Sequence, residues 1–188
     1  MDEALYRLHA EREETYWWWV AKNRIILHLI ERFWPGPADG TLSASEGSVG
    51  STGRTPIAGA QGSVRPRALD IGCGAGGVLA KLSTKFDAIG IDMSPIARDY
   101  CHKRGLKALD GSLPDNLLLS DIDATAGFDV IVMSEVIEHI KEDSASVHAA
   151  ARLLRPSGIM VCTVPAHMWL WSSHDDFNQH QTVFPDHP

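Results

Sequence analysis

Cysteine is scarce in this sequence of 188 residues, and the three that occur, Cys73, Cys101 and Cys162, are far apart and odd in number. A disulfide framework is therefore not expected, and we predict reduced thiols in a cytoplasmic protein. Long apolar runs are also missing, since the longest early one, residues 25–30, is interrupted by His28 and flanked by charged residues. The sequence thus predicts neither a signal peptide nor a membrane-spanning helix.

Positively charged residues are also few. Lys and Arg number 17 against 24 Asp and Glu, so the net charge is −7. This balance repels a phosphate backbone unless basic residues cluster, and no dense cluster is present, so nucleic acid is not a favoured partner. Hydrophobic residues are 44% and charged residues 22%. These values are near the globular averages and predict that most of the chain folds, as a single domain of ordinary size.

Three segments of different composition follow one another. Residues 11–34 have apolar residues at helical spacing, acidic residues early and basic residues late, and Pro35 ends the pattern. Residues 36–64 contain seven Gly, five Ser, three Thr and two Pro without an aromatic residue, which predicts a flexible insertion. We therefore expect an N-terminal helical segment over residues 1–35, a flexible insertion over 36–64 and a ligand-binding domain over 65–188.

Beyond the insertion, strand and helix signals alternate. Strands are expected at residues 68–71, 86–91, 106–109, 128–133 and 159–164, with helices near 76–84, 95–104, 135–140 and 144–154. Strands separated by helices indicate an α/β fold with a parallel sheet, here a doubly wound Rossmann-like sheet in three layers. Ligands of such sheets lie beyond the carboxyl ends of the strands, which directs attention to residues 70–77, Asp92, Asp110 and Ser134.

A glycine-rich turn follows the first expected strand. Gly72, Gly74 and Gly77 have the spacing G-x-G-x-x-G, and Asp92 lies 20 residues after Gly72, so a dinucleotide such as NAD is the first candidate. Asp70, however, stands at the mouth of this site and would oppose a pyrophosphate on the helix N-terminus. S-adenosylmethionine carries a sulfonium and an ammonium, has no phosphate and has a ribose diol for Asp92. The two acids therefore favour S-adenosylmethionine over NAD.

Four segments resemble the class I S-adenosylmethionine-dependent methyltransferases. The segments are residues 69–77 (LDIGCGAGG), 89–94 (IGIDMS), 128–131 (FDVI) and 153–158 (LLRPSG), in the order and spacing of that family. The resemblance covers about residues 66–166. It implies methyl transfer from S-adenosylmethionine to a small molecule, lipid or glycan.

The resemblance also implies roles for single residues. Gly72 and Gly74 would let the backbone approach the methionine part, Asp70 would orient its amino group, Asp92 would bind the ribose and Met93 would pack on adenine. An ordinary acid at a helix start remains the alternative for Asp92, as does a turn former for Asp110. The predicted cofactor-binding residues are Asp70, Gly72, Cys73, Gly74, Asp92, Met93, Asp110, Gly111 and Ser134.

Methyl transfer mainly requires that the nucleophile and the methyl group be aligned in a dry site. A hydroxyl nucleophile also needs a base, for which His139 is the candidate, the alternative being a histidine that closes a helical turn against the core. On a helix Glu135, Glu138 and His139 would share one face, and they are similar to the metal-binding motif of ubiquinone-pathway and small-RNA methyltransferases. Metal-free relatives carry similar residues, so we predict no metal.

Four consecutive aromatic residues, Tyr16 to Trp19, cannot all face one core from a helix. By resemblance we interpret residues 1–35 as a lid over the cofactor, with Trp18 a contact. The alternative is that the helix packs across the sheet and buries two of the three tryptophans.

Residues 164–176 resemble a substrate-side loop. The spacing of His167, His174 and His180 matches no zinc signature, which favours an exposed loop. The resemblance further implies a helix and two more strands after the fifth, for which we find no signal before Pro188. We therefore expect an exposed strand edge that invites dimerisation. A truncated S-adenosylmethionine-binding or interaction module without turnover is the alternative function, and a metal-dependent O-methyltransferase or an NAD-dependent enzyme is less favoured.

Overall fold

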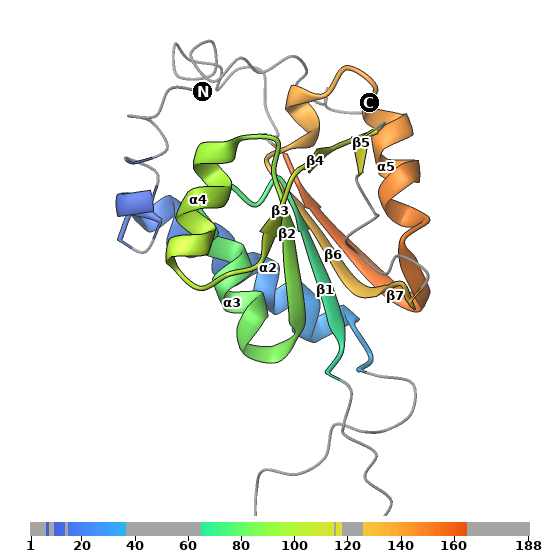
Figure 1. Cartoon of the computed structure of the whole chain (residues 1–188). Coiled ribbons are helices and arrows are strands. Elements are labelled where there is room, and N and C mark those ends of the chain that lie inside the picture. Colours follow the sequence, from blue (N-terminus) through green and yellow to red (C-terminus); the bar gives the residue numbers. More distant parts are fainter. Residues whose placement is uncertain are drawn as a thin grey trace, which may run out of the picture.

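A five-stranded parallel sheet forms the centre of the computed structural model, which describes residues 7, 10–13, 15–36, 65–114, 116–117 and 126–164. The strand order is β3-β2-β1-β6-β7 (Figure 1). The strands are β1 (Arg67–Ile71), β2 (Asp87–Ile91), β3 (Ala108–Leu109), β6 (Phe128–Ser134) and β7 (Leu154–Thr163). Successive strands run outward from β1 to β3 and then outward again from β6 to β7. The predicted doubly wound sheet is confirmed, and its switch point lies between β1 and β6.

Helices cover both faces of this sheet. On one face α2 (Trp17–Phe33), α3 (Gly77–Lys85) and α4 (Pro95–Lys103) supply Ile26, Leu79 and Cys101 to a core that also contains Ala68 of β1. On the other face α5 (Asp143–Ala151) supplies Ala149 and Ala150 to a second core, which contains Leu69, Ile131 and Met133 among others. Adjacent residues of β1 thus face opposite cores, as the period of two in a strand requires. The three predicted layers are confirmed.

Helix α4 shows how local sequence sets an element boundary. Ser94 is its N-cap, with its Oγ accepting a hydrogen bond of 3.4 Å from the amide of Ala97, and Pro95 takes the first helical position. Gly105 follows the helix with φ +72°, a conformation that a glycine adopts without a Cβ penalty. The predicted start and end of this helix are confirmed.

Other boundaries differ from expectation. The helix expected over residues 135–140 is only a 3₁₀ turn, η3 (Ile137–His139), because Glu135 has a left-handed backbone (φ +56°) and Val136 is not helical either. Residues 13, 15 and 16 lie in turns or bends, so that α2 begins at Trp17 rather than near residue 11. Strand β7 begins at Leu154, five residues before the expected start, and its pairing with β6 has an irregularity between Phe128 and Val130. A short hairpin of β4 (Gly111–Ser112) and β5 (Asn116–Leu117) was not expected.

Several predictions fall outside the described residues. They concern residues 37–64 of the insertion expected over 36–64, the loop after Val164 with its three histidines, and any strand beyond β7. Within the described part β7 lies at an edge of the sheet. Among these residues no helix has the length and apolar character to cross a bilayer.

Candidate cofactor site

The carboxyl ends of the central strands meet at one edge of the sheet, opposite the edge at which the chain enters β1 (Figure 1). Between β1 and α3 the backbone makes a tight loop in which Gly72, Gly74 and Gly76 all have positive φ. The amides of Gly72 and Cys73 donate hydrogen bonds of 2.8 and 3.1 Å to the carbonyl of Ile91 at the end of β2. The loop is therefore fixed against the neighbouring strand.

Asp70 lies in β1 just before this loop and is 2% exposed. Its Oδ2 has no hydrogen-bond partner among the described residues. Burial, followed by the charges of Glu13 and Asp92, raises the pKa of Asp70 to about 8. A buried carboxyl group with an unsatisfied oxygen is costly unless a ligand pairs with it, so the site fits a ligand with a cationic group.

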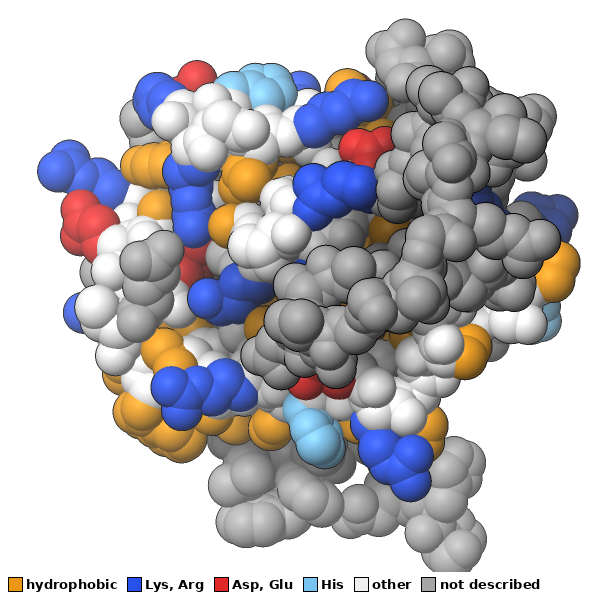
Figure 2. Space-filling model, turned by 90° about the horizontal axis from the view of Figure 1, so that it is seen from below, with side chains coloured by type: hydrophobic (Ala, Val, Ile, Leu, Met, Phe, Trp, Pro, Cys, Tyr) orange, Lys and Arg blue, Asp and Glu red, His pale blue; other side chains and the backbone are white. Residues whose placement is uncertain are grey.

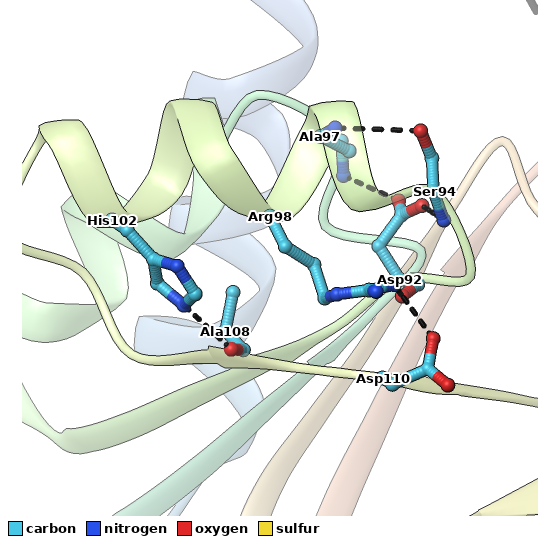
Figure 3. Close-up of polar contacts among 8 residues, drawn as sticks. Asp92, Ser94, Ala97, Arg98, His102, Ala108 and Asp110 are labelled. Atoms are coloured by element: carbon cyan, nitrogen blue, oxygen red, sulfur yellow. Dashed lines mark hydrogen bonds and ion pairs between the residues drawn. The ribbon is translucent and has the colours of Figure 1, made fainter.

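Asp92, at the end of β2, joins two turns of the site (Figure 3). Its Oδ2 accepts a hydrogen bond of 2.9 Å from the amide of Gly74, and its Oδ1 accepts one of 2.8 Å from the amide of Ser94. Burial raises the pKa of Asp92, although these two hydrogen bonds act to lower it. Each carboxylate oxygen has two acceptor positions, so this structural role leaves capacity for the predicted ribose contact.

Arg98 of α4 fixes the next acid along the edge. One of its Nη atoms donates hydrogen bonds of 2.6 Å to Oδ1 of Asp110 and 2.7 Å to the carbonyl of Asp92 (Figure 3). Asp110 is thus ion-paired and half-exposed, and Gly111 is buried at the start of β4. The side chain of Met93, beside Asp92, is 74% exposed, which leaves it available to pack on an adenine ring.

Two predicted residues have their side chains engaged elsewhere. Cys73 is buried with its Sγ 3.9 Å from the Sγ of Cys101, so that only its backbone borders the loop. The Oγ of Ser134 lies 3.0 Å from Oγ1 of Thr163 and joins the ends of β6 and β7. A cofactor contact of Cys73 would therefore be made by its backbone.

The N-terminal segment contributes residues that the sequence did not indicate. The carboxylate of Glu13 accepts a hydrogen bond of 3.0 Å from Arg104, which also donates one of 2.8 Å to the carbonyl of Ala75 in the glycine loop. Glu13 also receives a hydrogen bond from the backbone of Gly77, and burial raises its pKa. Lys22 of α2 forms an ion pair of 3.0 Å with Glu135. No local pattern could reveal these contacts, because they join residues far apart in the chain.

The acids after β6 do not form the helical face that a metal site would need. Glu135 points to Lys22, while Glu138 is 0% exposed and its carboxylate oxygens have no hydrogen-bond partner among the described residues. Burial, followed by the charge of Glu135, raises the pKa of Glu138 to about 7. His139 ends η3 and is half-buried. In the described part of the chain no three His, Cys, Asp or Glu residues are grouped to hold a metal ion.

Because of this arrangement, we expect the methyl transfer that the sequence resemblance implies to be independent of divalent metal. EDTA or added Mg²⁺ should change the initial rate less than about twofold, since no step would need a Lewis acid. The measurement is an assay with labelled methyl donor in metal-depleted buffer. A loss of activity with EDTA that Mg²⁺ restores would contradict the prediction.

A groove at the opposite edge of the sheet is distinct from this site. Its lining includes Arg65, Arg67 and Lys107 together with Asp87. Figure 2 shows several Lys and Arg side chains on the face seen from below. The strands begin at this edge, so the groove lies away from the glycine loop.

Comparison with known proteins supports the function expected of this site. The family model described as "Methyltransferase domain" matches residues 12–187. The chain belongs to this methyltransferase family. The predicted membership in the S-adenosylmethionine-dependent methyltransferases is thereby confirmed, and S-adenosylmethionine is the cofactor of these enzymes.

Curated relatives match about half of this methyltransferase. Ubiquinone biosynthesis O-methyltransferase of Rhodopseudomonas palustris (strain TIE-1) is 38% identical over 109 residues, which are 55% of this chain and 41% of the relative. The protein of the same name from Methylococcus capsulatus is 34% identical over 99 residues, 49% of this chain and 40% of the relative. The matches thus span less than half the length of these relatives.

Solved structures show the same fold. DesVI of Streptomyces venezuelae superposes with a TM-score of 0.59 at 19% identity, covering 92% of this chain and 61% of that protein. A SAM-dependent methyltransferase of Archaeoglobus fulgidus gives a TM-score of 0.52 at 16% identity, covering 88% of this chain and 63% of that one. At these identities the likeness concerns the fold.

Proposed function

We propose that this chain transfers the methyl group of S-adenosylmethionine to a hydroxyl group of a small molecule, lipid or glycan. The hydroxyl acceptor is supported by the relatives named O-methyltransferases. The observation that carries the proposal is Asp70 near the end of β1, a buried carboxyl whose Oδ2 has no hydrogen-bond partner in the described part of the chain. A cationic methyl donor pairs with such a group.

The charges near the glycine loop disfavour a pyrophosphate. Glu13 lies against Gly77 at the start of α3, and Asp70 lies just before the loop. A pyrophosphate at this helix N-terminus would face both carboxylates. This arrangement supports S-adenosylmethionine over a dinucleotide. Asp92 keeps its predicted role, which is to bind the ribose.

The bound donor supplies an activated methyl group, which leaves its sulfur as the acceptor oxygen attacks in line with the carbon–sulfur bond. The bond pair stays on sulfur, and the hydroxyl proton must leave the acceptor. His139 is assigned as the base that takes this proton, because it follows β6 at the carboxyl edge of the sheet. The remaining task of the protein is to align the two reactants and exclude water.

The aromatic segment is assigned to the mouth of the site. Trp17 and Trp18 are 69% and 45% exposed, and Trp19 is half-buried. The alternative that two of the three tryptophans are buried is therefore wrong. The rings form a cluster, with centroids of Tyr16 and Trp19 5.4 Å apart and those of Trp17 and Trp18 5.8 Å apart. A lid function of residues 1–35, with Trp18 as a contact, remains our proposal.

We expect calorimetric titration to show binding of S-adenosylmethionine and S-adenosylhomocysteine and no binding of NAD. Purified protein with methyl-labelled donor should then label at least one member of a panel of phenols, catechols, sugars and lipid extracts. Tighter binding of NAD would contradict the cofactor assignment. Donor binding without labelling of any acceptor across the panel would instead favour a binding module without turnover.

A further inference from the structure

Exposed apolar side chains gather on one segment of the molecule. Among the described residues six large hydrophobic side chains are exposed, and five of them belong to residues 16–33. On α2 itself the largest exposed fractions are those of Trp17 (69%), Phe33 (62%) and Ile25 (55%). A single exposed apolar residue needs no explanation, but a group of them on one element marks a surface that contacts a partner.

Residues at a spacing of four or eight form the outward side of α2. Trp17 and Ile25 are eight positions apart, and so are Arg24 and Arg32, with His28 midway between the two arginines. Since a helix turns once in about 3.6 residues, these five exposed side chains lie on one side of it. The buried residues of the helix lie on the opposite side and face the sheet (Figure 1). We refer to the five exposed residues as the outer face of α2.

The outer face of α2 carries positive charge, although the whole chain has a net charge of −7. Glu31 is the one acidic residue in the sequence of the helix, and its carboxylate is paired with Lys85 of α3. Arg24 and Arg32 have no acidic partner in the described part of the chain. Their charges therefore remain available to an anionic partner.

An anionic phospholipid surface fits this combination of side chains. Helices that lie in the plane of a membrane combine Trp, Phe and aliphatic residues with Lys and Arg, and the indole ring favours the membrane–water interface. On α2 the two kinds of group are adjacent, since the ring centroid of Phe33 lies 5.5 Å from Cζ of Arg32. Lipid headgroups adapt to the convex ridge of a single helix, whereas a protein partner would need a matching groove. No helix among the described residues can cross a bilayer, so the contact would be made in the plane of the surface.

We propose that the outer face of α2, together with Phe33, docks onto an anionic phospholipid membrane. The first half of α2 lies near the carboxyl edge of the sheet, because Lys22 pairs with Glu135, which directly follows β6. A docked molecule thus has its candidate cofactor site close to the lipid surface. Docking requires no methyl donor, so the proposal goes beyond the function proposed above and can be tested separately from it.

The test measures sedimentation of the full chain with lipid vesicles. The wild type should bind phosphatidylcholine vesicles that contain about 30% phosphatidylglycerol at least about tenfold more tightly than pure phosphatidylcholine vesicles. Salt at about 0.5 M should remove most of this preference, because it screens the charges. Arg24→Gln/Arg32→Gln should weaken binding to the anionic vesicles about 10- to 30-fold, since each basic residue near such a surface contributes about fivefold.

The apolar contribution is tested with Ile25→Ser/Phe33→Ser. Binding should weaken about tenfold or more at both salt concentrations, because salt does not screen the burial of apolar groups in the interface. Both double variants change exposed side chains, so their melting temperatures should stay close to that of the wild type. Absence of wild-type binding to the anionic vesicles, or binding that neither double variant weakens, would overturn the proposal.

Lys141→Gln/Arg152→Gln is the matched control. It removes the same charge from exposed residues on either side of α5, which covers the other face of the sheet. Wild-type affinity is expected, and a loss equal to that of Arg24→Gln/Arg32→Gln would show a general charge effect and overturn the proposal. A dimer in the absence of lipid that Ile25→Ser/Phe33→Ser dissociates would assign the outer face of α2 to a second copy of the chain and also overturn it. None of these outcomes depends on binding of S-adenosylmethionine, so failure of the proposed function would be seen separately.

Discussion

Replacing Asp70 with asparagine is expected to weaken binding of S-adenosylmethionine by about 30-fold or more, because hydrogen bonds to charged groups contribute about 1.5–3 kcal/mol. The carboxyl is 2% exposed, and its Oδ2 has no hydrogen-bond partner among the described residues. Asparagine keeps the size of the side chain and removes the charge that pairs with the donor. The measurement is calorimetry at pH 8.

The same substitution is expected to stabilise the ligand-free protein at high pH. Burial raises the pKa of Asp70 from 3.8 in the unfolded chain to about 8 in the folded state. For an acid with a raised folded pKa, the stabilising contribution is complete below the unfolded pKa and is lost as pH rises through the folded pKa. Asp70→Asn should therefore melt at a higher temperature than the wild type at pH 9, and this advantage should shrink toward pH 6.

Donor binding should also be linked to the proton of Asp70. At pH 7 the free protein holds this proton, and a cationic ligand favours the ionised carboxylate. Affinity should therefore rise with pH up to about 8, and binding at pH 7 should release protons, seen as a binding enthalpy that depends on the buffer. Asp87→Asn, at an exposed residue that begins β2, is the control and should change neither affinity nor proton release. A pH-independent affinity in the wild type would contradict the assignment of Asp70.

The core of the site was predictable because its signals are local. Gly72 and Gly74 follow a strand and precede a helix, and Asp92 follows the next strand, so the order of elements alone places them at one edge. The N-cap Ser94 was predictable for the same reason, since a cap and the helix it starts are adjacent in sequence. Parallel strands bring their carboxyl ends together whatever the intervening loops do.

Contacts between distant segments were not predictable in this way. Glu13 meets Arg104, 91 residues later, and Lys22 meets Glu135, and no periodicity encodes either pair. The helix expected at residues 135–140 is wrong for a related reason. The apolar residues Val136 and Ile137 fit a helical face, but the left-handed conformation of Glu135 and its pairing with Lys22 are decided by tertiary packing.

Gly72→Ala is expected to destabilise the fold by about 2–5 kcal/mol through two separable effects. Gly72 has φ +70°, and a Cβ there would lie 2.3 Å from Cγ2 of Val136. The left-handed conformation alone should account for about 1–2 kcal/mol in a residue other than glycine. The clash with Val136 should account for the remainder, about 1–3 kcal/mol.

Gly74→Ala separates these effects, because Gly74 has φ +52° but no atom of the described residues lies within 4 Å of the position of a Cβ. Both variants lose the same freedom of glycine in the unfolded chain, so the difference between their free energies of unfolding reports the clash. In urea denaturation without ligand, the free energy of unfolding should be highest for the wild type, lower for Gly74→Ala and lowest for Gly72→Ala. Val136→Ala removes the Cγ atoms that clash with a Cβ at position 72. The double variant Gly72→Ala/Val136→Ala should therefore lose about 1–3 kcal/mol less free energy of unfolding than the sum of the losses of the two single variants. If the losses in free energy of unfolding are additive, the segment after β6 does not press on the glycine loop, and the two segments adopt their conformations independently.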